Sequence, residues 1–169
     1  MVDAGILGEK DRVELIRGEI LEMSPIGPPH DGSVLRAINN FFAILGKRAI
    51  VGSQGSVRLS EYDEPQPDIY LLRPRDDFYT RRKAGPSDVF LIIEVADSSL
   101  KYDRTIKAEL YAEKGVPEYW VADIPGDCVW VYSERRGKAY PKIDQLHRGD
   151  FRVPKLLPDC RIPIDIVLP

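Results

Sequence analysis

The sequence predicts one α/β domain in which a mixed β-sheet is flanked by helices. Short runs rich in β-branched and aromatic residues recur along the chain, as expected of strands, and two longer segments carry apolar residues at helical spacing. The chain has 169 residues, of which 43% are hydrophobic and 30% charged. This composition can build one core and is not typical of a disordered chain. We therefore expect residues 1–169 to form a single domain.

The first predicted elements are a hairpin and a helix. The strand-like runs Val13–Ile16 and Glu19–Met23 surround a turn at Arg17-Gly18, and the prolines of residues 24–29 then break the pattern. Ser33–Lys47 carries apolar residues with a helical repeat, which predicts an amphipathic helix packed on the sheet. These apolar residues are Val34, Ala37, Ile38, Phe41, Phe42 and Leu45.

Three strands are expected in the middle of the chain. Ser56–Ser60 alternates between polar and apolar residues, and Pro67–Leu72 follows an acidic turn at residues 61–66. After a basic loop at residues 73–87, Val89–Ala96 is a nearly continuous apolar run. Such a run is typical of a strand that is buried on both faces.

A second helix is predicted over Asp103–Lys114. Ile106 and Leu110 are expected to face the core. Gly115 stands where a helix commonly ends on a glycine, and Pro117 prevents its extension.

The last third of the chain adds two more expected strands. Glu118–Asp123 and Val129–Ser133 are apolar runs joined through Pro125-Gly126. The tail that follows is interrupted by prolines, and we expect it to lie along the edge of the sheet.

The charge pattern gives weak information about partners. The net charge is −3, which does not indicate a nucleic-acid-binding protein, so contact with phosphates would require local positive charge. Two basic clusters could supply that charge, although solvated loop surface is the ordinary interpretation of such clusters. They are Arg73, Arg75, Arg81, Arg82 and Lys83, and Arg135, Arg136 and Lys138.

The cysteines and histidines exclude a zinc site of the usual spacing. Cys128 and Cys160 lie in separate apolar stretches, which indicates buried, reduced thiols, and the chain has only two histidines. A metal would have to be held by carboxylates, which favours Mg²⁺ or Mn²⁺. Residues 1–10 do not read as a signal peptide and no apolar run is long enough to cross a bilayer, so we expect a cytoplasmic protein with no membrane contact.

Two carboxylates interrupt the predicted strands. Glu94 lies inside the buried run Val89–Ala96, where a charge is costly unless it is paired or binds a metal. Asp68 begins another strand directly after Pro67. Carboxylates from neighbouring strands can converge on one face and hold a hard divalent cation.

Lys107 is the best candidate for a positive charge beside these carboxylates. It lies on the helix that follows the Glu94 strand, and it shares a face with Asp103, four residues earlier. The alternative interpretation is an ordinary ion pair on the helix surface.

Several segments of the chain, in this order, carry a resemblance to a known family. They are Pro67–Leu72; Ile93–Val95 with Ser98-Ser99; Asp103, Lys107 and Tyr111; and Gly115–Asp123. Together they resemble a restriction endonuclease family that is common in bacteria and belongs to the PD-(D/E)XK nuclease superfamily. The opening Glu14–Ile20, with Met23-Ser24-Pro25 and His30, is similar to the N-terminal part of that family. The resemblance covers residues 11–133 and is most specific at Gly115–Asp123.

The resemblance implies a restriction-endonuclease-like sandwich and a Mg²⁺-dependent phosphodiesterase site. Asp68 matches the aspartate of the motif and Glu94 its second acidic residue, and both would bind the metal. The usual lysine of the superfamily stands two residues after that acid, where this chain has Ala96. The resemblance therefore implies that Lys107, on the following helix, replaces it.

Three further residues are weaker candidates. Glu22 could extend the metal shell, because the superfamily often adds an acidic residue from the N-terminal region. His30, expected just before the first helix, could contact a phosphate or cap the helix, and Gln54 precedes the strand that carries Val57. An exposed or structural role is the alternative for each.

The sequence thus favours an endonuclease that hydrolyses DNA with Asp68, Glu94 and Lys107 as its catalytic residues. The loop with the first basic cluster, Arg73 to Lys83, would close over the substrate. The alternative is an inactive nuclease-fold module that binds nucleic acid or protein, and Ala96 favours it modestly. A homodimer is compatible with cleavage of two strands, and the sequence shows no motif for reading bases.

Overall fold

A computed structural model describes residues 12–23 and 25–169. Three α-helices are assigned in it, α1 (Pro28–Leu45), α2 (Leu100–Tyr102) and α3 (Ala108–Glu113), together with three short helices of other types. Of these, η1 (Pro86–Asp88) and η3 (Ile164–Val167) are 3-10 helices, and η2 (Asp103–Lys107) is a π-helix. The strands are β1 (Val13–Ile16), β2 (Glu19–Glu22), β3 (Ile50–Ser53), β4 (Ile69–Leu72), β5 (Val89–Ala96), β6 (Tyr119–Asp123), β7 (Cys128–Ser133), β8 (Lys142–His147), β9 (Phe151–Arg152) and β10 (Ile162–Pro163).

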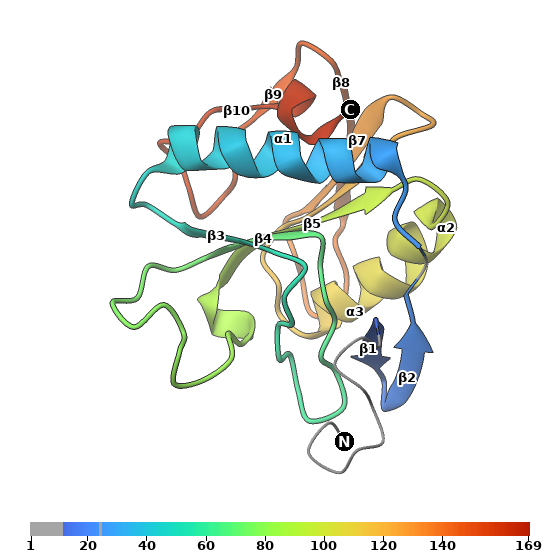
Figure 1. Ribbon diagram of the computed structural model, residues 1–169, viewed down its shortest axis with the longest axis vertical. Coiled ribbons are helices and arrows are strands. Elements are labelled where there is room, and N and C mark those ends of the chain that lie inside the picture. Colours follow the sequence, from blue (N-terminus) through green and yellow to red (C-terminus); the bar gives the residue numbers. More distant parts are fainter. Residues whose placement is uncertain (1–11, 24) are drawn as a thin grey trace.

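Six strands form the central sheet in the order β3-β4-β5-β6-β7-β8 (Figure 1). Strands β5 and β6 are parallel, because the helical segment between them returns the chain to the same end of the sheet, and the other neighbours are antiparallel. The sheet is therefore mixed, as the sequence predicts.

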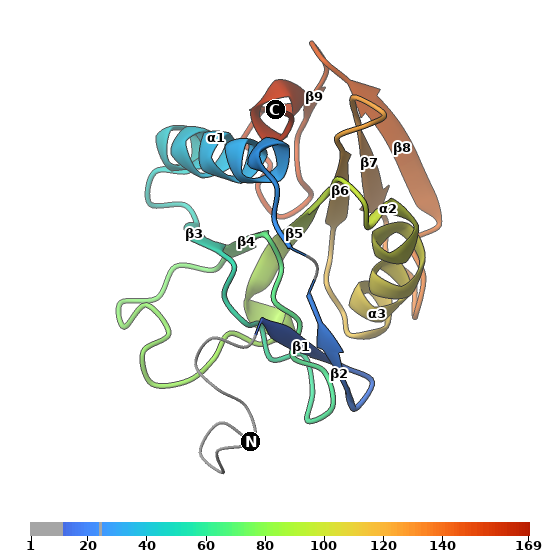
Figure 2. The same cartoon turned by 45° about the vertical axis from the view of Figure 1, so that its right-hand side comes forward.

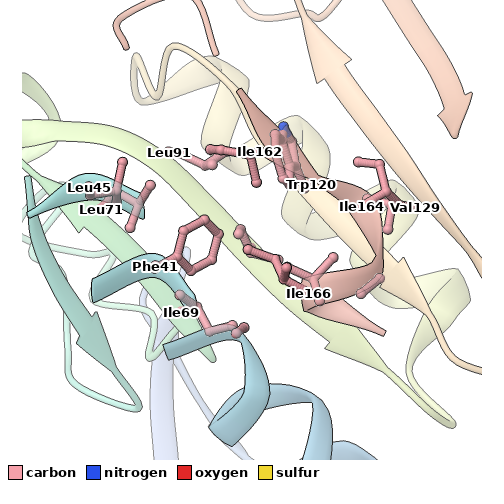
Figure 3. Close-up of a cluster of buried hydrophobic side chains, with 14 of the residues drawn as sticks. Phe41, Leu45, Ile69, Leu71, Leu91, Trp120, Val129, Ile162, Ile164 and Ile166 are labelled. Carbon is pink, nitrogen blue, oxygen red and sulfur yellow. The ribbon is translucent and has the colours of Figure 1, made fainter. Parts of the chain in front are cut away.

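Helices and loops cover the sheet on both faces (Figures 1 and 2). On one face, α1 and the C-terminal segment around η3 pack on side chains from β4 to β7 (Figure 3). On the other face, α3 packs against β5, β6 and β7. The result is a sandwich with one apolar layer on each side of the sheet.

Strand β5 is buried along its whole length, as expected from its sequence. Leu91, Ile93 and Val95 belong to the α1 layer, whereas Ile92 and Ala96 belong to the α3 layer. Because side chains alternate between the two faces of a strand, Glu94 points to the face that α3 covers.

Helix α1 is longer than predicted at its N-terminal end. It begins at Pro28 rather than at Ser33, because proline suits the first turn of a helix, where its missing N–H has no partner to lose. The helical repeat predicts its buried face correctly at Phe41 and Leu45, but Phe42 is 58% exposed and points away from the sheet.

The segment Ser56–Ser60 is not a strand, contrary to the prediction. Its alternation does bury Val57 and Leu59. However, its backbone hydrogen bonds are to loop residues, since the N–H groups of Val57, Arg58 and Leu59 donate to Pro65, Ala84 and Asp63. The edge strand of the sheet is instead β3, which the sequence analysis missed because Ile50–Ser53 is short and contains a glycine.

The second predicted helix exists but starts earlier and is not uniform. Segments α2, η2 and α3 run without a break from Leu100 to Glu113, with the π-helical stretch in the middle. Leu110 is fully buried as predicted, whereas Ile106 is 37% exposed, because the wider π turn changes the angular position of the residues within it. Gly115 follows the helix with φ +93°, as expected of a C-terminal glycine.

Several smaller predictions are confirmed. The β1–β2 hairpin turns at Arg17 and Gly18, which both have positive φ. Cys128 and Cys160 are buried free thiols. Strand β8 lies at one edge of the sheet, as expected of the tail. Within residues 12–23 and 25–169, no helix is long and apolar enough to span a membrane.

Candidate active site

The structure brings Asp68 and Glu94 together at one end of β4 and β5. Antiparallel pairing sets Ile69 opposite Ile93, so Asp68, just before β4, lies beside Glu94. The Asp68 N–H donates to Oε2 of Glu94 at 3.2 Å, and the Val95 N–H donates to Oδ2 of Asp68 at 2.8 Å. Both carboxylates are buried. The prediction that they converge is therefore confirmed in the geometry.

Lys107 contacts one of these two acids, Glu94, from the helical side. Its Nζ lies 3.0 Å from Oε1 of Glu94 and 3.2 Å from Oε2 of Glu14, which comes from the β1–β2 hairpin. The hydroxyl of Tyr111, one turn further along the helix, donates to Oε1 of Glu94 at 2.7 Å. Lys107 is 5% exposed, so the interpretation as a surface ion pair is wrong.

The π-helix η2 spans both charged helical residues of the site, Asp103 and Lys107. Both side chains are buried on the face of the helix that lies against the sheet. Ser99 donates a hydrogen bond to the Asp103 carboxylate, and the hydroxyl of Tyr119 donates to the Asp103 carbonyl at 3.1 Å. Single π turns inside α-helices are frequent at functional sites.

The charged side chains of this cluster line a cavity of about 150 Å³ between the hairpin, the start of α1, the ends of β4 and β5, and α2. Four buried carboxylates face it, and Lys107 is the one buried ammonium group that lines it within the described part of the chain. The carboxylates are those of Glu14, Asp68, Glu94 and Asp103. Buried acidic side chains therefore outnumber buried ammonium groups in the lining of this cavity.

Burial and the attraction between opposite charges together set the pKa values in this cluster. Burial raises the pKa of Glu94 well above the usual 4.5 although Lys107 opposes the effect, and it also raises the pKa of Asp103. For Lys107, burial alone would lower the pKa, but the attraction of Glu94 and Glu14 prevails and raises it. Lys107 therefore remains protonated.

His30 adds a second, titratable cation at the edge of the cavity. Its Nε2 lies 3.0 Å from Oδ1 of Asp68. Burial alone would lower the pKa of His30, but the hydrogen bond to Asp68 and the charge of that carboxylate raise it above 6.5. The other ring nitrogen, Nδ1, is buried without a hydrogen-bond partner in the described structure.

The donor set suits a hard divalent cation, although it does not form a complete metal centre. Residues 12–23 and 25–169 contain no group of three His, Cys, Asp or Glu side chains spaced as ligands. Oxygens of Asp68 and Glu94 instead accept hydrogen bonds from protein donors. The excess of buried carboxylate over buried cationic charge nevertheless fits Mg²⁺ or Mn²⁺, which prefer oxygen ligands.

A sequence model of a protein family described as "Putative restriction endonuclease" matches residues 4–165 of the chain. The chain belongs to this restriction endonuclease family. The crystal structure of a protein from Anabaena variabilis ATCC 29413, described as a "putative nuclease", has a similar fold. The TM-score is 0.73 at 14% identity, over 98% of this chain and 94% of that one. A search of curated proteins found no match.

Two of the three weaker site candidates in this member of the restriction endonuclease family, Glu22 and His30, line the cavity. Glu22, at the end of β2, lines the cavity but is exposed. His30 also lines it, but it belongs to the first turn of α1 and does not precede the helix, which corrects the prediction. Gln54 is exposed and does not line the cavity; its backbone N–H donates to the carbonyls of Pro67 and Asp68.

The predicted substrate loop lies away from this cavity. None of its five basic side chains lines the cavity, because the loop leaves β4 at the end opposite Asp68. Three of them form ion pairs, Arg75 with Asp77, Arg82 with Asp88 and Lys83 with Glu64. Closure of the loop over the site is therefore not supported, and its contact with a substrate remains a prediction.

Sequence reasoning missed Glu14 as a site residue. Glu14 and Ile16 are the two buried positions of β1, so the signal was an acidic residue on the inward face of an alternating strand. The partner of this carboxylate, Lys107, lies 93 positions later in the chain, and strand alternation does not identify a partner that distant.

Proposed function

We propose that this protein is a metal-dependent endonuclease that hydrolyses phosphodiester bonds of DNA. The observation that carries the proposal is the buried contact of Lys107 with Glu94 beside Asp68, inside a cavity that four buried carboxylates line. Membership of a restriction endonuclease family supports the nuclease reaction. The metal and DNA as substrate are inferred from the chemistry of the site.

Asp68 and Glu94 would hold the cation. A bound Mg²⁺ or Mn²⁺ would supply a Lewis acid that polarises the phosphodiester and lowers the pKa of an attacking water. Protein groups fix the orientation of both carboxylates, since Val95 N–H donates to Asp68 and Tyr111 hydroxyl donates to Glu94. Such fixed ligands reduce the reorganisation needed when the site is loaded.

Lys107 would act as a positive charge and hydrogen-bond donor. Because its pKa is raised, its ammonium group remains protonated at neutral pH and does not serve as a general base. Its Nζ can orient water or offset charge on the phosphate while it keeps its contact with Glu94. Glu14 holds the other side of this ammonium group and acts as a positioning residue.

The position of Lys107 also bears on the inactive-module alternative. That alternative rests on Ala96, which stands where the superfamily usually has its lysine. Ala96 lies on the same face of β5 as Glu94, and the ammonium group that contacts Glu94 comes from Lys107 of the adjacent helix. This arrangement supports a replaced lysine and an active site.

The experiment is a supercoiled-plasmid nicking assay with Mg²⁺ or Mn²⁺, and with EDTA as the metal-free control. We expect Asp68→Asn, Glu94→Gln and Lys107→Met each to lose about 100-fold or more of the nicking rate. Glu109→Gln and Lys101→Met are matched controls, because both residues are exposed on the same helical segment and do not line the cavity.

Each result has a direct meaning for the proposal. Metal-dependent nicking that is lost in the three site variants and kept in the two controls would support it. Absence of nicking by the wild-type chain, together with no calorimetric binding of Mg²⁺ or Mn²⁺, would reject it in favour of a binding module. Circular dichroism of each variant separates loss of activity from loss of fold.

A further inference from the structure

The loop after β4 lies at the other end of that strand from the active site (Figures 1 and 2), and it carries the exposed side chain of Phe78. Phe78 is 71% exposed, more than any other large apolar residue in the described parts of the chain. A single exposed apolar side chain is ordinary on a protein surface. Phe78 differs from the others because it lies in a loop that also carries Arg75, Arg81 and Arg82.

Side-chain and backbone hydrogen bonds hold this loop in one shape. Arg75 donates two hydrogen bonds of 2.8 Å to the Asp77 carboxylate, which also accepts from Tyr79 N–H at 3.3 Å. The Tyr79 hydroxyl donates to the carbonyl of Arg73 at 2.8 Å. Thr80 N–H closes the turn on the Asp77 carbonyl at 2.9 Å. These hydrogen bonds give the loop a defined conformation.

The backbone at the tip of the loop is strained. Phe78 and Tyr79 have φ of +46° and +62°, a conformation that is unfavourable for residues with bulky side chains. The two side chains have different surroundings. The guanidinium groups of Arg75 and Arg82 lie 5.2 and 5.4 Å from the centre of the Tyr79 ring, whereas Phe78 is exposed. Strain that is held by surrounding contacts is common where a side chain serves in binding.

Three basic residues that follow Phe78 in the loop keep charged groups at the surface. Arg81 is exposed and forms no ion pair with any described residue. The side chains of Arg82 and Lys83 are 46% and 53% exposed although they are paired with acids, so they retain N–H groups that face solvent. An exposed aromatic ring beside arginines is the combination that single-stranded nucleic acids bind, by base stacking and phosphate contacts.

We propose that this loop, residues 73–83, is a second nucleic-acid contact in which Phe78 stacks on a base and its neighbouring arginines contact phosphates. The inference rests on the proposed function in its choice of nucleic acid as the ligand. A second copy of the chain would not use the cationic surroundings, which repel their own copy. The loop thus anchors the substrate and does not cover the active site.

The distance between the active site and the loop sets a minimum length for a DNA strand that contacts both. Five residues of extended strand separate Asp68 from Arg73, which corresponds to about 17 Å. In B-form DNA this span corresponds to about 5 nucleotides of one strand, at about 3.4 Å each. A strand much shorter than this cannot occupy the cavity and the loop together, whereas a strand of about 24 nucleotides can.

The test compares wild type, Phe78→Ala and Phe78→Trp, with Phe42→Ala as a matched control, because Phe42 is an exposed phenylalanine on the outer side of α1. Fluorescence anisotropy measures binding of labelled 24-nucleotide DNA, single-stranded and duplex, without metal. We expect Phe78→Ala to weaken binding about 5- to 100-fold, as expected for the loss of one stacked base, and Phe78→Trp to retain it. In the nicking assay, Phe78→Ala should raise KM and leave kcat unchanged.

The single-stranded and duplex probes distinguish two sources of the stacked base, an unpaired strand and an opened duplex step. Equal binding by wild type and Phe78→Ala on both probes would overturn the inference, even if the protein nicks DNA. Phe78-dependent binding without any nicking would support the inference and reject the proposed catalysis. A change in sedimentation caused by Phe78→Ala in the absence of DNA would assign the ring to self-association and overturn the inference. Binding of the wild-type protein to anionic vesicles but not to DNA would also overturn it.

Discussion

The ammonium nitrogen of Lys107 lies 3.0 Å from Oε1 of Glu94, and the two residues are 5% and 2% exposed. Removing both charges from water costs several kcal/mol for each ion, so a buried pair of this kind is rarely more stable than an apolar pair of the same volume. Retention of the charged pair in the interior is easier to explain by chemistry at the cavity than by stability.

The first prediction concerns the stability of this pair. Lys107→Met leaves Glu94 and Glu14 buried without their cation, so we expect the free energy of unfolding at about pH 7 to fall by about 3–5 kcal/mol. Glu94→Gln added to Lys107→Met should recover part of this loss, because it removes one of the stranded charges. Urea denaturation of the two single variants and the double variant measures the coupling. Strictly additive losses would show that the two residues do not interact.

A second prediction separates the role of Tyr111 in the site from its role in the core. Its hydroxyl donates to Glu94 at 2.7 Å, whereas the buried hydroxyl of Tyr140 donates to the Val116 carbonyl at 2.8 Å, away from the cavity. Tyr111→Phe and Tyr140→Phe should each cost about 1–3 kcal/mol in urea denaturation. Only Tyr111→Phe should also lower the nicking rate and raise the Mg²⁺ concentration needed for half of the maximal rate. Equal rates in both variants would confine Tyr111 to a packing role.

The acidic pair of the site could be predicted because each member contradicts its surroundings. Glu94 interrupts an apolar strand, and Asp68 begins the neighbouring one, so the cost of burial indicated a function for both. Strand alternation then places Glu94 on one face without any knowledge of the fold. The two residues meet because β4 pairs with β5. The sequence does not specify this pairing directly, but strands that follow one another in the chain commonly pair.

The helical part of the site was harder to predict for a local reason. The sequence places Asp103 and Lys107 on one face at α-helical spacing, but the segment between them is π-helical. This change leaves Ile106 partly exposed, against the prediction, while Leu110 beyond it follows the expected face. Apolar periodicity assumes one repeat along a helix and does not detect a change within it.

Tertiary contacts explain the remaining differences. Val57 and Leu59 are buried as an alternating strand would bury them, yet their segment lies across the sheet surface and pairs with loops. Glu14 belongs to the site only because the hairpin packs beside the helix, where Arg17 also contacts Glu109. Neither arrangement depends on local residue preferences, so neither could be read from a short window of sequence.

A third prediction tests the face of α1 with two neighbouring phenylalanines. Phe41 is fully buried in the layer between α1 and the sheet (Figure 3), whereas Phe42 is largely exposed. Phe41→Ala should lower the free energy of unfolding by about 3–5 kcal/mol, because it leaves a cavity in a packed layer. Phe42→Ala should change it by less than about 0.5 kcal/mol. Comparable losses in the two variants would mean that α1 is rotated about its axis.

The last prediction concerns Asp63, which ties the hairpin turn to the end of α3. Its carboxylate accepts from Arg17 N–H at 2.7 Å and from the Ser60 hydroxyl at 2.6 Å, and it pairs with Lys114 at 2.8 Å. Burial alone would raise the pKa of Asp63, but these hydrogen bonds prevail and hold it below the ordinary 3.8. The ionised form is therefore favoured in the folded state over the unfolded state.

A lowered pKa in the folded state contributes stability that is complete above the unfolded pKa and is lost as the pH falls through the folded pKa. Asp63→Asn should therefore lower the free energy of unfolding by about 1–3 kcal/mol at about pH 7. The difference from wild type should stay constant down to about pH 4.5 and shrink below the ordinary value of 3.8. Asp159→Asn, an exposed aspartate whose side chain makes no hydrogen bond in the described structure, is the control. Urea denaturation across this pH range measures both variants. A difference that grows towards acid pH would contradict the assignment, because it would require the Asp63 carboxyl to be favoured in its protonated form.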